Sequence, residues 1–249
     1  MGHTITMSIR NSKMRSINAI RFGVPVLMIL VVALIAYEPI YSKIMESRLK
    51  DYLSISAEDP ARLATILRFG KRTFTRDRLN EALWIEAYFG NVKSCSILIA
   101  AGADPKGTTG DQDTPIAAAV SNGKDNVAEL LLSFGANPNH SKMGEPLLIT
   151  AIRRFSDIAA QDSSLQAERS DMQVVTVLLK HGANPNILAN GHTPLTIAAK
   201  KGNVELIKEL LLARADPGIK NGDGLTPLAI AVKEKHEDCA LLLNLNNKK

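Results

Sequence analysis

Gly182-Ala183-Asn184-Pro185 is followed, eight residues after its proline, by Thr193-Pro194-Leu195, and this pair of motifs recurs along the chain. The first motif also occurs, with small changes, as Gly102-Ala103-Asp104-Pro105, Gly135-Ala136-Asn137-Pro138 and Arg214-Ala215-Asp216-Pro217. The second also occurs as Thr114-Pro115-Ile116, Glu145-Pro146-Leu147 and Thr226-Pro227-Leu228. Gly102 and Gly135 are 33 residues apart, and Ala183 and Ala215 are 32 apart. A period near 33 predicts a stack of similar supersecondary units.

The two motifs are signals for the end and the start of helices. A glycine after an apolar helical run suits the left-handed position that ends a helix, and the following proline prevents its continuation. A threonine before proline suits a helix start, because its hydroxyl can accept from free backbone N–H groups. Each unit is therefore predicted to hold a short, Ala-rich first helix and a second helix with an apolar stripe, as in 204–212.

These motifs resemble those of the ankyrin repeat family, over roughly Leu79 to Leu243. The resemblance implies an all-α solenoid of about five repeats, a curved surface of loops and first helices, and binding of another protein there. The family usually has His after Thr-Pro-Leu, and this chain has Ala117, Leu148, Thr196 and Ala229 instead. The resemblance therefore implies that a stabilising hydrogen bond typical of the family is missing.

The boundaries of the repeat domain follow from the same signals. Asp59-Pro60 opens a helical half-unit, which predicts an N-terminal capping element over 59–78 and the repeat domain over 79–249. The third repeat breaks the period, because Gly135 and Gly182 are 47 residues apart. The surplus at 155–170 has no Gly or Pro and could prolong one or both helices. It is either a tolerated surface insertion or a projection that contacts a specific partner.

The N-terminal part has the composition of a membrane anchor. Residues 22–37 carry no charge, and residues 22–41, with the single acid Glu38, are long enough to cross a bilayer. The small-residue pair of a signal-peptide cleavage site is missing at the end of this run, which favours an uncleaved anchor over a cleaved signal peptide. A basic tail over 1–21 precedes the span, and a helical stalk is expected over 42–58.

The charges around the span predict its orientation. Arg10, Lys13, Arg15 and Arg21 precede it, and three basic residues follow it closely. A short basic tail favours the cytoplasmic side, which places the repeats outside the cytoplasm, in a bacterium in the periplasm of the inner membrane. The formal net charge of +5 comes mostly from this tail, because the rest of the chain has 26 basic and 25 acidic residues. The basic character therefore gives no support for nucleic-acid binding.

The sequence contains no pattern that predicts catalysis, a cofactor or a metal. None of the five histidines has metal-ligand spacing to a Cys, Asp or Glu, and no nucleophile elbow or phosphate loop occurs. Cys95 and Cys239 fall on second helices four repeats apart, roughly 30 to 40 Å at the usual helix spacing, which excludes a disulfide between them. Both are expected to be buried thiols that pack as small apolar residues.

The predicted function is a membrane-tethered, non-catalytic scaffold that binds another protein. It could support an envelope enzyme or act as an immunity protein against an envelope-acting toxin, and a reversed topology would make it a cytoplasm-facing membrane adaptor. A small-molecule substrate is not expected. Arginine and aromatic residues are favoured as the centres of interfaces. The candidate binding residues are Tyr88, Phe89, Arg153, Arg154, Lys200 and Lys201 on first helices, and His140, Lys142 and His192 on loops. Ser121, Asn122, Lys233 and Glu234 occupy similar first-helix ends.

Overall fold

The recurring motifs mark the ends of paired helices throughout the structure. The computed structural model describes residues 43–52, 59–70, 73–109, 113–161 and 165–246, with residues 156–161 and 165–171 described by backbone alone. Within these residues, a helix over 43–52 and α2 precede five helix pairs. The helices are α2 (Pro60–Phe69), α3 (Arg76–Phe89), α4 (Val92–Ala100), α5 (Pro115–Ser121), α6 (Asp125–Ser133), α7 (Leu147–Gln161), α8 (Leu165–Lys180), α9 (Pro194–Lys201), α10 (Val204–Leu212), α11 (Pro227–Lys233) and α12 (Glu237–Asn246).

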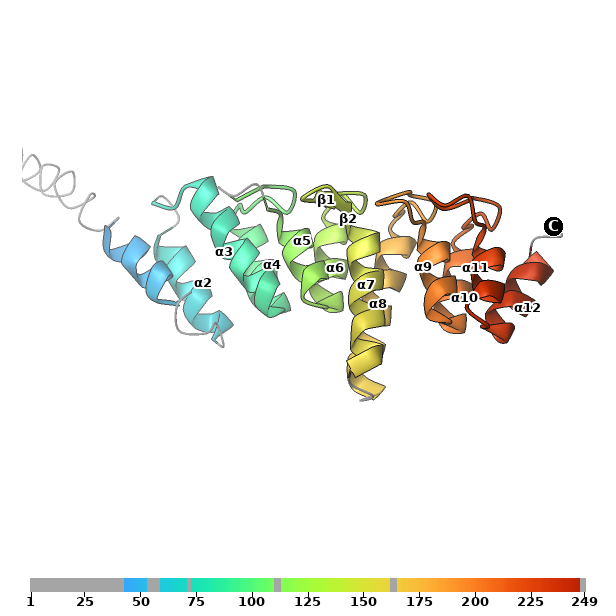
Figure 1. Ribbon diagram of the computed structural model, residues 1–249. Coiled ribbons are helices and arrows are strands. Elements are labelled where there is room, and N and C mark those ends of the chain that lie inside the picture. Colours follow the sequence, from blue (N-terminus) through green and yellow to red (C-terminus); the bar gives the residue numbers. More distant parts are fainter. Residues whose placement is uncertain (1–42, 53–58, 71–72, 110–112, 162–164, 247–249) are drawn as a thin grey trace, which may run out of the picture.

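The helix pairs stand side by side in a single stack (Figure 1). The first helices α3, α5, α7, α9 and α11 each contact the next one and form an inner row, and the second helices form an outer row. The loops between repeats lie along one edge, where β1 (Ser141–Lys142) and β2 (Glu145–Pro146) form a two-residue antiparallel pair. One apolar core runs between the rows through the whole stack. The predicted all-α ankyrin-like solenoid is confirmed for the described residues.

The first motif ends each second helix and turns the chain into the next loop. Gly102, Gly135 and Gly182 adopt left-handed backbone angles, with φ of 110°, 84° and 89°, and the equivalent Arg214 has φ of 64°. The following alanine is buried, and its N–H donates back to the helix, as in Ala183 N to Leu178 O at 2.9 Å. The Asp or Asn side chain then accepts from the N–H two residues on, at 2.8 to 3.0 Å, which closes the turn.

The second motif starts α5, α9 and α11 as predicted, whereas α7 begins at Leu147, the last residue of its motif, and α3 begins at Arg76. Thr114, Thr193 and Thr226 each cap a helix whose first residue is proline, and each hydroxyl accepts from the N–H three residues on. Thr196, which stands where the family usually has His, makes a hydrogen bond of its own to the helix start. Its hydroxyl accepts from Thr193 N at 2.8 Å, while Thr193 Oγ1 accepts from Thr196 N at 3.2 Å, a reciprocal capping box. A hydroxyl in the position usually held by His can therefore supply a bond to the helix start.

The surplus residues of the third repeat prolong both of its helices, as the sequence allowed. Helix α7 is 15 residues long and α8 is 16, whereas α9 and α10 have 8 and 9. The two helices extend together beyond the stack, on the edge opposite the loops (Figure 1).

The predicted membrane span at 22–41 and the basic tail at 1–21 lie outside the described residues. Within the residues that the structure describes, no helix is both long and apolar enough to cross a bilayer.

Candidate partner-binding surface

The predicted binding residues fall on two separate edges of the stack. His140, Lys142 and His192 belong to the loop edge, near β1 and the bridge between Ala189 and His192. Tyr88, Phe89, Lys200 and Lys201 lie in the last turns of α3 and α9, at the opposite ends of the inner helices. One compact partner could not centre on both edges, so the two groups must be assessed separately.

The inner-helix ends share a common frame that makes their residues comparable. A residue with left-handed backbone angles follows α3, α5, α9 and α11, namely Gly90, Gly123, Gly202 and Lys235. The two residues that precede it change in character along the stack. They are Tyr88 and Phe89 in α3, Ser121 and Asn122 after α5, Lys200 and Lys201 in α9, and Lys233 and Glu234 after α11. The inner edge is therefore aromatic at its N-terminal end and rich in lysine at its C-terminal end.

The aromatic end consists of three rings, Trp84, Tyr88 and Phe89, which we call the aromatic cluster. Trp84 and Tyr88 stack with ring centroids 5.8 Å apart, and Phe89 meets Tyr88 edge to face at 5.3 Å. Tyr88 and Phe89 remain 44% and 50% exposed, although rings of this size are usually covered. The Trp84 Nε1 atom is buried and has no hydrogen-bond partner among the described residues. Rigid, exposed rings are the side chains most enriched at the centres of protein interfaces.

The two candidate arginines are held by contacts within the protein. Arg153 is exposed but pairs with Glu145 at 3.1 Å, and Arg154 Nη1 donates to the backbone oxygen of Ser121 at 3.2 Å. Arg154 thus joins α7 to the end of α5, a structural contact between neighbouring repeats. Any role of either arginine in binding stays a prediction.

The candidates on the loop edge also serve the fold. Lys142 pairs with Asp113 of the preceding loop at 2.6 Å, and His192 exchanges backbone hydrogen bonds with Ala189. His140 N donates to Asn137 O, and His140 O accepts from Leu147 N. These contacts fix the loops, and the ion pair with Asp113 makes the Lys142 ammonium less available to a partner.

The segment predicted as a stalk packs on the first repeat where the structure describes it. In the helix over 43–52, Met45, Leu49 and Tyr52 are buried, and Leu49 and Tyr52 belong to the common core. The Tyr52 hydroxyl lies 3.3 Å from Ser94 Oγ in α4. A cavity of about 540 Å³ remains between this helix and α3, lined on one side by Leu49 and Lys50 and on the other by Arg78 and Ile85.

A buried carboxyl lies under this packed helix. Glu86 in α3 is fully buried, and its Oε2 accepts from Asn91 Nδ2 at 2.8 Å. Its other oxygen has no hydrogen-bond partner among the described residues. Burial raises the pKa of Glu86 from 4.5 to about 7, although hydrogen bonds from Asn91 and Ser94 act in the opposite direction. No sequence pattern predicts this buried group, because a glutamate in an amphipathic helix is ordinarily exposed.

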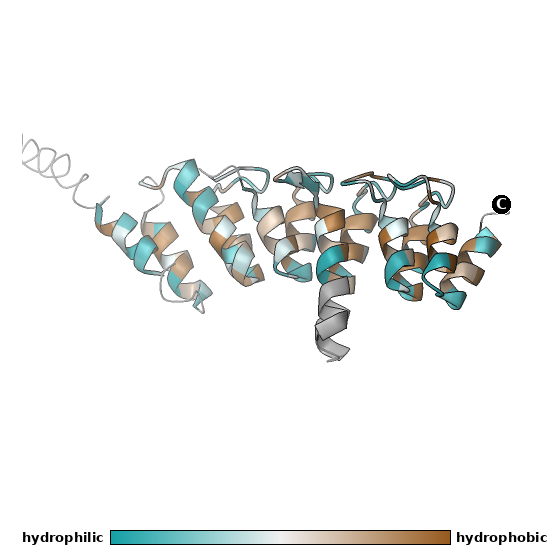
Figure 2. Cartoon of the chain, viewed as in Figure 1, coloured by the Kyte–Doolittle hydropathy of each residue, from teal (hydrophilic) through white to brown (hydrophobic). Residues whose placement is uncertain are grey.

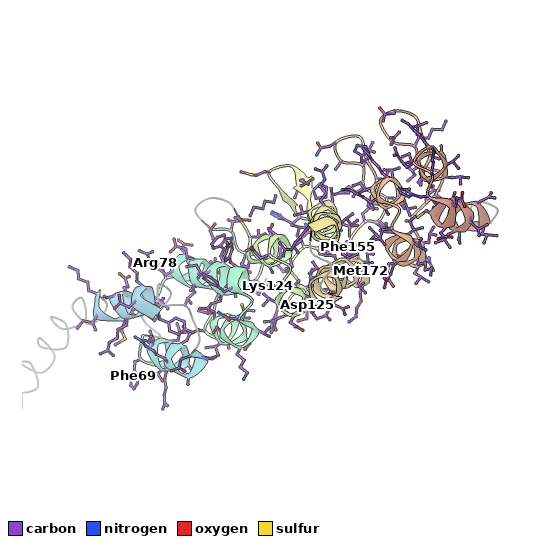
Figure 3. All side chains as sticks on the ribbon, turned by 60° about the horizontal axis from the view of Figure 1, so that its bottom comes forward. Phe69, Arg78, Lys124, Asp125, Phe155 and Met172 are labelled. Atoms are coloured by element: carbon purple, nitrogen blue, oxygen red, sulfur yellow. The ribbon has the colours of Figure 1, made fainter. Side chains whose placement is uncertain are left out.

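The extension of the third repeat has an apolar base. Phe155 from α7 and Met172 from α8 are buried and lie close together where the two helices leave the stack (Figure 3). Both residues belong to the common core, which therefore reaches the base of the extension, and α7 and α8 pack against each other.

The two cysteines behave as the sequence predicted. Cys95 and Cys239 are free and buried. Burial raises the pKa of the Cys95 thiol to about 12 and also raises that of Cys239, so both remain protonated near neutral pH. In the part of the chain that the structure describes, no group of three or more His, Cys, Asp or Glu residues could hold a metal ion.

The fold defines a helical-repeat protein whose available groups lie on helix ends and loops. The family model for ankyrin repeats in three copies matches residues 83–161 and again 164–249, more than half of the chain. The chain therefore belongs to the ankyrin repeat family.

Several curated proteins share this similarity over their repeats. An ankyrin repeat and KH domain-containing protein of Caenorhabditis briggsae is 32% identical over 160 residues, which are 64% of this chain and 6% of that protein. Human ankyrin repeat and MYND domain-containing protein 1 is 48% identical over 52 residues, 21% of this chain and 6% of that protein. The mouse B-cell lymphoma 3 protein homolog is 31% identical over 121 residues, 47% and 24% of the two chains. The chain thus spans a small part of each of these relatives.

Proposed function

We propose that this protein is a membrane-tethered scaffold that binds another protein through the ends of its inner helices. Membership of the ankyrin repeat family supports a protein-binding role and a non-catalytic one. The observation that carries the proposal is the aromatic cluster, whose Tyr88 and Phe89 stay about half exposed on a well-packed helix. Exposed rings held rigidly by mutual contacts lose little conformational entropy on binding, which favours them as an anchor.

Tethering is supported by the composition of residues 22–41 and by the packing of the helix that follows them. Because the helix over 43–52, which begins two residues after the proposed span, is buried against the first repeat, that repeat would lie close to the membrane. The aromatic cluster in the first repeat would then lie near the membrane surface. The charge bias of the N-terminal tail supports repeats outside the cytoplasm, in the periplasm if the source is a bacterium.

Site-specific photocrosslinking of the full chain in its native membrane tests the binding surface. A crosslinkable amino acid at position 89 is expected to form a discrete adduct with another protein. The same amino acid at Ser96, an exposed position on the outer helix α4, serves as the matched control. Loss of the adduct in a Tyr88→Ala variant would support the cluster as anchor. Equal labelling from both positions would contradict the proposal.

The orientation has its own test. An alkaline phosphatase reporter, fused after Lys249 and active only outside the cytoplasm, is expected to be active. Activity of a cytoplasm-specific reporter at the same place would instead favour a membrane adaptor that faces the cytoplasm.

A further inference from the structure

The C-terminal half of the inner edge exposes two lysines, Lys200 and Lys233, whose charge the described residues do not pair. Lys200 and Lys233 occupy the same position of α9 and α11, two residues before the left-handed residues Gly202 and Lys235. Both side chains are exposed, and neither makes an ion pair among the described residues. Lys235 is exposed beside them. We call these three residues the lysine patch.

Three other basic side chains of the stack are neutralised by a neighbouring carboxylate. Arg76 pairs with Asp104 at 2.6 Å, Lys142 with Asp113 at 2.6 Å and Lys180 with Glu129 at 3.1 Å. In each case a neighbouring loop or helix supplies the carboxylate. The positive charge of Lys200 and Lys233 therefore remains available to another molecule.

A general preference for cations at helix C-termini does not account for the patch. Such a preference exists, because the helix dipole favours positive charge there. However, the last turns of α3, α4, α5, α6, α10 and α12 contain no basic residue. Single basic residues occur in the last turns of α2 and α8, Arg68 and Lys180, but the inner helices with a basic last turn are the neighbours α9 and α11, where hydrophilic residues gather at the lower ends (Figure 2).

The acidic residues nearby lie mainly on the other row. Glu205, Glu237 and Asp238 begin the outer helices α10 and α12, so they follow the turns rather than the inner-helix ends. Glu234 is the one acidic residue within the two-residue frame at the compared inner-helix ends. The inner edge is thus positive where the outer row is negative, which favours approach of an acidic partner from the inner side.

We propose that the lysine patch binds an acidic segment of the partner protein, with carboxylates about 10 Å apart. That spacing follows from the usual 8 to 10 Å between packed helices such as α9 and α11. It corresponds to every third residue of an extended segment, at about 3.3 Å per residue. The inference rests on the proposed function, because it names the chemistry of one part of the same partner.

A defined peptide tests this inference. The probe is a fluorescein-labelled dodecapeptide of Gly and Ser with Glu at every third position, and its counterpart has Gln at those positions. Binding to the full chain is measured by fluorescence anisotropy at low ionic strength. We expect the Glu peptide to bind about tenfold more tightly than the Gln peptide, with the difference shrinking as salt is added, because exposed ion pairs are individually weak and screened.

A matched pair of double variants locates the effect. Lys200→Glu with Lys233→Glu is expected to remove the preference for the Glu peptide. Lys93→Glu with Lys208→Glu makes the same change of charge at exposed positions of the outer helices α4 and α10, and is expected to retain it. Equal binding of the two peptides, or equal losses in both double variants, would overturn the inference. Crosslinking from position 89 is independent of these lysines, so its success or failure reports separately on the proposed function.

Discussion

The first repeat and the last two repeats place chemically opposite side chains at equivalent positions. The first repeat buries an acidic residue and exposes aromatic rings, whereas the last two bury alanines and expose lysines. Four residues before the left-handed turn, α3 has Glu86, whereas α5, α9 and α11 have Ala119, Ala198 and Ala231. All four side chains are fully buried. The exposed helix ends show the opposite difference in polarity. There α3 exposes aromatic rings, whereas α9 exposes lysines. The repeat therefore fixes where a side chain points but leaves its chemistry open.

The helix over 43–52 explains why the first repeat tolerates polar groups inside. Ser94 occupies the position held by Val127, Leu206 and Cys239 in other second helices, and the Tyr52 hydroxyl reaches it from the N-terminal helix. A buried polar group is costly unless it is hydrogen-bonded, and here an added helix supplies one of the partners. The internal repeats pack instead against two complete neighbours and need only apolar contacts.

The largest effect is expected from titrating Glu86. Its folded-state pKa of about 7 lies above the ordinary 4.5, so the folded protein binds this proton more tightly than the unfolded chain does. The resulting stability is full below about pH 4.5 and is lost as the pH rises through 7, a decrease of roughly 3 kcal/mol in the free energy of unfolding. Urea denaturation of the full chain at several pH values measures this decrease.

A Glu86→Gln variant is the control, because the amide keeps the shape of the side chain but does not titrate. Its stability should fall much less between pH 5 and pH 8 than that of the wild type. Identical pH dependence in both proteins would show that Glu86 is not the titrating group.

A smaller effect is expected at the asparagines that join successive loops. Asn139 Oδ1 accepts from Asn184 N, and Asn186 Oδ1 accepts from Asp216 N, both at 2.7 Å. The equivalent residue in the preceding loop is Lys106. Replacing Asn186 with Ala should therefore lower the free energy of unfolding by about 1 kcal/mol, whereas Lys106→Ala should change it by less than about 0.5 kcal/mol. Thermal unfolding of the two variants compares them directly, and equal losses would contradict a specific role for the asparagine.

The sequence predicted those parts of the molecule that depend on local chemistry. Helix starts at Thr193-Pro194 and helix ends at Gly182 follow from bonds within a few residues, so the motifs alone located them. Asn139 and Asn184 are 45 positions apart in the sequence, and Tyr52 and Ser94 are 42 apart. Contacts of that range depend on how whole repeats stack, which a single unit does not encode.

For the candidate surface, the sequence predicted which positions are exposed but not which side chains pair with one another. The exposed positions of Tyr88, Phe89 and Lys200 followed from the repeat frame, and the structure places them where that frame predicted. The frame did not reveal that Glu145 holds Arg153 or that Arg154 bonds to the end of α5. Those pairings depend on side-chain lengths across neighbouring repeats. The sequence positions of basic residues therefore do not by themselves predict which basic side chains are available to bind a partner.

The smallest effects on stability are expected at the left-handed position that follows the outer helices. This position is glycine after α4, α6 and α8 but Arg214 after α10. Gly182 has φ of 89° and an added Cβ would meet no atom within 4 Å, so Gly182→Ala should destabilise through backbone strain, by about 0.5 kcal/mol after the lower freedom of the unfolded chain is subtracted. Arg214 already carries that strain at φ of 64°. Arg214→Gly should therefore stabilise the protein, by about 0.5 kcal/mol, because greater freedom of the unfolded chain offsets part of the gain. Denaturation midpoints of the two variants should shift in opposite directions, and a loss of stability in Arg214→Gly would show that the arginine side chain makes a compensating contribution.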